Sequence, residues 1–486
     1  MSRRRSPWAV LALVCAANFL VILDVAIVNV ALPSVQRDLA FAPGDLQWVI
    51  SAYALTFGGL LLLGGRMGDL AGRRGVFMTG VAVFTVASLV CGLAESQATL
   101  IAARTVQGIG AALISPTGLS IVTTTFAEGP ARNKALGIWG AVGGGGAAAG
   151  VLLGGVLTES LGWEWVFFVN VPVGLAALAL APALLERDAR NAGRLDVAGA
   201  ALVTAALVVL VFALVEAPDA GWGSAQTLAL LAGACLLLAA FVVVESRATA
   251  PVVPLSTFRR RTPTVANAIA VLQGAMVFAT FLLLSLYMQQ VLGWSALEAG
   301  LAYLTTALMA IVSAAAAQAV ISRAGVKPVL LVGLCAFLVA QLWFTALSPT
   351  GDYAADLLLG MVAMGVGVGA SFVAVSVAAV AGSTDADAGL ASGLVTTAQQ
   401  VGGALGVAVL TAVAVARTED DLAAGATMPS ALTDGFTGAF LVAAAIALAS
   451  VALAALLLDA DDLREVDARS ASVSSGAAGP GRPGRT

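Results

Sequence analysis

The sequence contains no histidine, and only 11% of its 486 residues are charged. An ordinary soluble domain has about a quarter of its residues charged, so this composition excludes an ordinary soluble protein. Its four cysteines lie far apart along the chain, so neither a zinc site nor a disulfide framework is indicated, and we interpret them as small packing residues. With no nucleotide-binding loop and no constellation for nucleophilic catalysis either, the sequence predicts no enzyme, no bound metal, no cofactor and no nucleic-acid partner.

Long uncharged runs are what the sequence does have, and 60% of it is hydrophobic. Leu46–Leu63 and Val76–Leu93 are each 18 residues without a charge. As helices they would be about 27 Å long, close to the hydrocarbon thickness of a bilayer. Both runs are therefore predicted to span a membrane.

The same criterion predicts an all-α polytopic membrane protein with fourteen transmembrane helices. The first run, Trp8–Leu32, is too long for the apolar core of a signal peptide, so we expect an uncleaved first span. The fourteen spans are expected at about 8–32, 46–65, 76–94, 98–122, 134–157, 164–185, 196–216, 226–245, 264–290, 297–320, 327–347, 354–380, 388–415 and 436–458.

The positions of the basic residues fix the predicted topology. Of the 24 Lys and Arg, 21 fall in the termini and in alternate loops, while Arg37 and Arg417 fall in the other loops and Arg104 lies within a span. Cytoplasmic loops retain Lys and Arg, so both termini are predicted to be cytoplasmic. The abundance of Ala, Gly and Arg, with only two Lys, suggests a bacterium with a GC-rich genome and hence the bacterial cytoplasmic membrane.

An internal echo suggests two related halves. Ser322–Lys327 is a degraded copy of Asp69–Arg74, with Gly325 matching Gly72. If two middle spans are set aside, both copies lie between the second and third spans of a six-helix bundle, which gives a 6+2+6 arrangement. The expected domains are an N-terminal bundle (1–195), two extra and peripheral spans with a basic linker (196–260), a C-terminal bundle (261–458) and a disordered cytoplasmic tail (459–486).

Asp24 and Arg104 are charged residues inside predicted spans. A carboxylate within a span should face a cavity or a partner, and burial disfavours its charged form, which suits reversible protonation. Counting about 1.5 Å per residue from the span ends places the two side chains at nearly the same depth, so they can pair directly or through water. Protonation of Asp24 would then weaken its attraction to Arg104 and shift a conformational equilibrium. Alternatively, Asp24 is a structural acid near the outer interface and Arg104 extends outward to water.

Two glycine-rich stretches carry further signals. The first, Gly64–Phe77, is a charged loop predicted to make a tight reversal, although any such turn needs glycine for bending and arginine for topology. The second has nine glycines between Gly137 and Gly155, inside a span. Glycine weakens a helix, so this density indicates close helix packing.

These stretches resemble the major facilitator superfamily. Its loop between spans 2 and 3 has the pattern G-x-x-x-D-x-x-G-R-R, and the family associates this loop with stabilising the outward-open state. Arg104–Gly110 resembles the span 4 motif of proton-coupled members. The span 5 glycines resemble the antiporter motif of drug and proton exchangers, with Val151 in place of the usual proline. The matching residues are Gly65, Asp69, Gly72, Arg73 and Arg74 in the loop and Gly140, Gly146, Gly150, Gly154 and Gly155 in span 5.

Polar and aromatic residues of several spans are candidates for binding substrate, because aromatic faces beside amides suit flat or amphipathic molecules. Ordinary packing is the alternative for each of them. The predicted ninth span contains no carboxylate, which favours neutral, zwitterionic or monocationic substrates over dications. The candidates are Asn29, Tyr53, Gln107, Asn267, Gln273, Phe281 and Tyr287.

The resemblance is to the fourteen-span drug and proton antiporters, and it covers nearly everything before Asp459. It implies a monomeric efflux permease that exchanges external protons for a hydrophobic or amphipathic compound by alternating access, with Asp24 and Arg104 as the proton-coupling pair. The alternatives are proton-linked uptake of a metabolite and a membrane sensor that transports nothing. The sequence identifies no particular substrate.

Overall fold

The computed structural model describes residues 6–42, 44–126, 130–186, 196–248, 251, 260–379 and 385–458. Across these ranges the regular structure is helical and contains no strand. Twelve helices are long and apolar enough to cross a membrane, and two shorter apolar helical stretches, Ala148–Leu161 and Ala198–Leu214, accompany them. The chain is therefore a multi-pass membrane protein.

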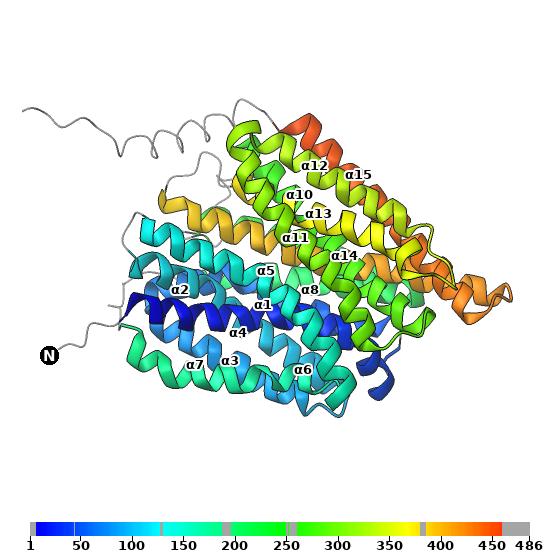
Figure 1. The fold of residues 1–486 in the computed structure, drawn as a ribbon, viewed down its shortest axis with the longest axis horizontal. Helices are drawn as coiled ribbons and strands as arrows, with labels where there is room; N and C mark the ends of the chain where they lie inside the picture. The colour runs from blue at the N-terminus through cyan, green and yellow to red at the C-terminus, as the bar shows by residue number, and fades with distance from the viewer. Residues whose placement is uncertain are drawn as a thin grey trace, which may run out of the picture.

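The N-terminal helices pack into one group, on one side of the molecule (Figure 1). Within it, α1 packs against α5, and α4 packs against both α2 and α3. The predicted sixth span is divided, with the single turn of α6 leading into α7. The helices are α1 (Pro7–Asp38), α2 (Trp48–Ala71), α3 (Arg73–Gly92), α4 (Gln97–Thr125), α5 (Pro130–Leu161), α6 (Trp165–Phe168) and α7 (Asn170–Leu184).

The C-terminal helices form a second group, coloured green to red in Figure 1. Its packing repeats that of the first group, since α10 packs against α14, and α13 packs against both α11 and α12. A π-helical turn, Tyr287–Val291, extends α10, and a second, Tyr353–Leu357, precedes α13. The helices are α10 (Arg261–Leu286), α11 (Ala296–Ala324), α12 (Val326–Phe344), α13 (Leu358–Ala379), α14 (Asp385–Ala423) and α15 (Met428–Leu457).

The two groups meet through α1 with α10, α2 with α14, and α5 with α11. We call the end of the molecule where α1 begins the Pro7 end, and the end where α1 finishes the Asp38 end. At the Asp38 end α5 and α11 approach so closely that a Cβ on Gly155 would lie 2.8 Å from the carbonyl oxygen of Ala296. Backbone contact at this distance leaves no space for solvent between the groups here.

Two further helices, α8 (Val197–Ala220) and α9 (Ala225–Arg247), connect the groups and pack against each other. α8 also packs against both α2 and α14, so it covers the line along which these two helices meet. Its Leu207 and Val211 share an apolar cluster with Ala54 of α2 and Ala404 of α14. The expectation that the two extra helices are peripheral stays a prediction, and the exposed side chains of Val208 and Phe212 on α8 agree with it.

The glycine-rich stretch 64–77 is more helical than predicted. α2 continues to Ala71 and α3 begins at Arg73, so the reversal is confined to Gly72, whose φ is 96°. An L-residue rarely adopts this φ, which explains the need for glycine at this one position. The predicted loop is thus the last two turns of one helix and the first turn of the next.

Candidate functional site

Asp24 of α1 and Arg104 of α4 meet inside the first group of helices. The Nη1 atom of Arg104 lies 2.5 Å from Oδ2 of Asp24, and the side chains are 2% and 0% exposed, respectively. Arg104 therefore does not extend to the outer surface. The equal depths estimated by counting residues along the two spans are realised as a direct ion pair.

Two amides complete the surroundings of the Asp24 carboxylate. Nε2 of Gln107 donates to Oδ1 of Asp24 at 2.8 Å, and Nδ2 of Asn170 donates to the same oxygen at 3.2 Å. Together with Nη1 of Arg104, the two amides supply hydrogen-bond donors to both oxygens of the carboxylate. Oδ1 of Asn170 is buried and has no hydrogen-bond partner.

Gln107 connects the ion pair to α3. Its Oε1 accepts from Nη1 of Arg104 at 2.7 Å, and its Nε2 donates to Oγ of Ser88 at 2.8 Å. The thiol of Cys91 lies 3.7 Å from the same Oε1. Since Arg104 and Gln107 are three residues apart on α4, they share a face of that helix and reach Asp24 together.

The guanidinium of Arg104 is held from two further directions. Its Nε donates to the carbonyl of Val49 at 2.9 Å. Its Cζ lies 4.3 Å from the centre of the Tyr53 ring and 5.8 Å from that of Phe167. A planar cation can combine a directed N–H, a carboxylate and an aromatic face in this way, whereas an ammonium cannot.

The network is a buried charge pair with most of its hydrogen-bonding groups satisfied. Removing the charge of one partner would leave the other charge buried and uncompensated, which destabilises such sites by about 3–5 kcal/mol. Protonation of Asp24 is a reversible form of this change.

The glycines of α5 lie against α1 on both sides of Asp24. A Cβ on Gly150 would lie 2.6 Å from Cβ of Ala26 and 2.9 Å from the carbonyl of Leu23, and one on Gly154 would lie 2.9 Å from the carbonyl of Ile27. Gly146 packs on Ile22 and Phe19 of the same helix, whereas Gly155 faces α11. Gly140 lies in α5, but its surroundings are outside what the structure describes.

The residues of the predicted conformational loop lie at the Pro7 end, around the break at Gly72. Gly65 packs on Pro116 of α4, with an ideal Cβ 3.4 Å from the proline Cβ. Arg74 donates from Nη1 to the carbonyl of Leu185 at 3.4 Å, and Arg73 opens α3. The Asp69 side chain lies outside the described part of the structure, so its predicted hydrogen bonds stay a prediction.

The seven candidate substrate residues are distributed over several places. Tyr53 and Gln107 belong to the network around Asp24, and Gln273 of α10 donates to Ser371 of α13 at 2.5 Å. Phe281 stacks on Tyr303 with ring centroids 4.9 Å apart. The remaining three bond to backbone carbonyls: Asn29 to Val25, Asn267 to Pro263 and Tyr287 to Ser348.

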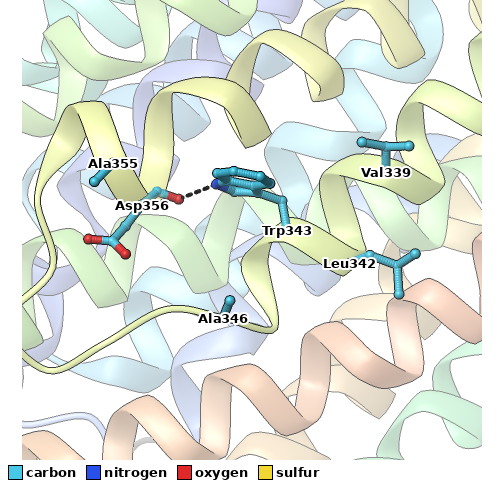
Figure 2. A pocket seen from close by; sticks show the side chains of 6 residues that line it. All are labelled: Val339, Leu342, Trp343, Ala346, Ala355 and Asp356. Carbon is cyan, nitrogen blue, oxygen red and sulfur yellow. Dashed lines mark hydrogen bonds between the residues drawn. The ribbon is translucent and has the colours of Figure 1, made fainter.

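One described pocket, of about 310 Å³, lies beside α12 at the Asp38 end, and none of the seven candidates lines it. Figure 2 shows the Trp343 indole over it, donating to the backbone carbonyl of Asp356 at 2.8 Å. This hydrogen bond ties α12 to the π-helical turn before α13. The remaining lining residues of the pocket are Val339, Leu342, Ala346 and Ala355.

The sequence analysis missed three members of the network: Ser88, Cys91 and Asn170. Ser88 and Cys91 are three residues apart and therefore share a helix face, which is a weak signal because small residues are common in spans. Asn170 is a fully buried amide of α7, next to the apolar turn α6. Only the packing of α3 on α4, and of α7 on α1 and α3, brings the three to the surroundings of Asp24.

Comparison with known proteins shows relatives that align with nearly the whole chain. The chain is 40% identical to the cephamycin export protein of Amycolatopsis lactamdurans over 452 residues, 92% of each chain. It is 41% identical to the puromycin resistance protein of Streptomyces alboniger, covering 91% of this chain and 88% of that one. The tetracenomycin C resistance and export protein of Streptomyces glaucescens is 38% identical, with coverage of 86% and 78%.

Solved structures agree on the fold. A POT family peptide transporter superposes with a TM-score of 0.68 at 14% identity, covering 93% of this chain and 98% of that one. A bacterial homologue of the human lysosomal transporter Spinster gives 0.64 at 16% identity, covering 96% and 99%. The family model of the Major Facilitator Superfamily matches residues 14–407. The chain belongs to the major facilitator superfamily of transporters.

Proposed function

We propose that this protein exports hydrophobic or amphipathic small molecules, antibiotics among them, across the bacterial cytoplasmic membrane in exchange for protons. The buried pair of Asp24 and Arg104 carries the proposal, because an ionisable pair inside a membrane bundle is rarely retained without a function. Relatives named for the export of cephamycin and tetracenomycin C, or for resistance to puromycin, support the substrate class. The proton gradient replaces any cofactor, and a single chain suffices.

The proposed architecture is fourteen spans arranged as 6+2+6, with both termini cytoplasmic. The twelve long apolar helices and the two shorter apolar stretches in α5 and α8 support this count. The N-terminal bundle is 1–195, the connecting pair with its linker 196–260, the C-terminal bundle 261–458 and the tail 459–486. The Asp38 end then faces outward, and the conformation described above is closed to the outside.

The proposed cycle turns on the charge of Asp24. In the outward-open state an external proton neutralises Asp24, and Arg104 loses its charged partner but keeps the Val49 carbonyl, Gln107 and the Tyr53 ring. Rotation of the Asn170 amide lets its unpaired Oδ1 accept the new O–H, which stabilises the neutral form. The neutral site favours the inward-facing state, where the proton leaves and substrate is taken up.

The test is proton-gradient-driven efflux of a lipophilic monocationic dye, and of puromycin, in inverted membrane vesicles. Asp24→Asn is compared with Asp434→Asn, which removes an exposed acid of α15, at equal membrane insertion. We expect the first variant to lose gradient-driven transport and the second to keep it. Gradient-dependent transport by Asp24→Asn at the wild-type rate would refute the coupling role, and flux in the opposite direction would indicate uptake.

A further inference from the structure

The last two turns of α1 contain a proline, Pro33, inside the helix. In an α-helix the N–H of residue 33 would donate to the carbonyl of residue 29, but proline has no N–H, and its ring crowds that carbonyl. The carbonyl of Asn29 therefore lacks its helical partner. In the interior of a membrane protein such a group must find another donor or be reached by water.

The donor comes from the other group of helices. Oγ of Ser285 on α10 donates to the carbonyl of Asn29 at 2.8 Å, and Ser285 is fully buried. The buried serines Ser88 and Ser450 donate within their own helices, to the carbonyls of Phe84 and Ile446. Ser285 instead reaches across the boundary between the groups.

Neighbouring side chains direct the Ser285 hydroxyl toward α1. The carbonyl of Phe281, which lies four residues before Ser285 on the same helix, accepts a hydrogen bond from the hydroxyl of Tyr303 at 2.6 Å. Nε2 of Gln289 donates to Oγ of Ser285 at 3.2 Å and to the carbonyl of Val30 at 3.0 Å. Because that oxygen accepts from Gln289, its own proton is free for the Asn29 carbonyl.

We propose that Pro33, Ser285 and Gln289 form a latch that holds the Asp38 end closed. The acceptor of the latch is the Asn29 carbonyl, which Pro33 leaves without its helical donor. The latch rests on the alternating-access transport proposed above. When the groups separate at this end, water enters and replaces Ser285 at the carbonyl, so the bond favours the closed state only by its advantage over water. Asp24 and Asn29 lie on the same helix, so a displacement of α1 by the charge of Asp24 also moves the latch.

The test measures the distance between spin labels at the Asp38 end, one on each group. Labels are placed at the exposed positions Ala98 and Ala424, through Ala98→Cys and Ala424→Cys, with the exposed Cys235 and Cys335 replaced by alanine. Pulsed electron resonance then gives the ratio of open to closed molecules in lipid nanodiscs. It needs neither substrate nor a proton gradient, so failure of the latch and failure of drug export are observed separately.

Ser285→Ala is expected to raise the open-to-closed ratio about 2- to 12-fold, the range of one net hydrogen bond. Ser450→Ala, which removes a buried hydroxyl bonded within its own helix, should leave the ratio unchanged. Pro33→Ala restores the helical donor to Asn29, and in that background Ser285→Ala should change the ratio less than twofold. This loss of effect separates the latch from simple packing at position 285.

Two results would overturn the proposal. One is a ratio for Ser285→Ala equal to that for Ser450→Ala. The other is an effect of Ser285→Ala that stays the same size after Pro33→Ala, since the hydroxyl would then act on something other than the freed carbonyl. If Ser285→Ala does not insert into the membrane, two other variants give the same comparison. Ser285→Thr keeps the hydroxyl, whereas Gln289→Leu removes the donor that orients it. Equal open-to-closed ratios for these two variants would likewise refute the latch.

Discussion

At the scale of the residue, the geometry of Arg104 requires an arginine and not merely a positive charge. Its Nε and its flat face contact α2, through the Val49 carbonyl and the Tyr53 ring, and its Nη1 contacts Asp24 of α1. Lysine at this position would keep the charge but lose the fork and the flat face. We therefore expect Arg104→Lys to lower the rate of gradient-driven efflux at least tenfold, since about 1.5–3 kcal/mol is associated with each hydrogen bond to a charged group.

The matched control for this change is Arg417→Lys, at an exposed position of α14. It makes the same chemical replacement outside the network and should leave the rate within twofold of wild type. Both variants are compared in vesicles at equal protein content. Wild-type rates in Arg104→Lys would show that the charge alone is sufficient and that the directed contacts are not needed.

Individual residues also show what sequence can predict here. Asp24 and Arg104 were predictable because a charge inside a span is rare, and because a helix rises by a fixed distance per residue, which gives their depth. Ser88, Cys91 and Asn170 were not, since their arrival at the site depends on how α3 and α7 are rotated. Ser285 was missed for the same reason, although Pro33 on its own marks a carbonyl that needs a donor.

At the scale of the element, α5 connects the ion pair to the boundary between the groups. Gly150 packs on α1 next to Asp24, and Gly155, less than two turns later, packs on α11. The resemblance to the antiporter motif pointed to this helix, but the sequence did not reveal that its glycines face two different partners. The stretch 64–77 gives the opposite case, because its high polarity suggested a loop where helix α2 in fact continues to Ala71.

Gly150→Ala tests the close packing of α5 on α1. The added methyl would lie 2.6 Å from Cβ of Ala26 and 2.9 Å from the Leu23 carbonyl, so the helices must move apart. Overpacking of this kind costs about 1–3 kcal/mol, and we expect a lower melting temperature together with slower efflux. Fluorescence-detected melting of the purified protein and the vesicle assay give the two readings.

Gly233→Ala in α9 is the control, because nothing lies within 4 Å of the Cβ it would add. Alanine is a better helix former than glycine by up to about 1 kcal/mol, so this variant should melt at the wild-type temperature or slightly above. A Gly150→Ala variant that behaves like Gly233→Ala would show that the helices accommodate the methyl and that close approach is not required.

At the scale of the whole molecule, α8 contacts both groups and cannot follow both when they separate. Two adjacent glycines of α2 each face a different helix. A Cβ on Gly58 would lie 2.7 Å from Cβ of Gln400 on α14, whereas a Cβ on Gly59 would lie 3.2 Å from Cβ of Thr204 on α8. Trp48 of α2 also contacts Phe212 of α8, with ring centroids 6.3 Å apart. We predict that α8 moves together with α2 and slides against α14.

A pair of engineered disulfides tests this prediction: both Cβ separations are shorter than the 3.5–4.5 Å of a disulfide, so each bond needs only a small separation of the helices. Gly59→Cys with Thr204→Cys ties α8 to α2 and should leave efflux within about twofold of the reduced protein. Gly58→Cys with Gln400→Cys ties α2 to α14 and should stop efflux until a reductant is added. The two tethers are comparable because they start from neighbouring residues of α2 and differ only in the helix to which they join it. If the tether between α2 and α8 also stops efflux reversibly, then α8 moves relative to α2 during transport and accompanies α14 instead.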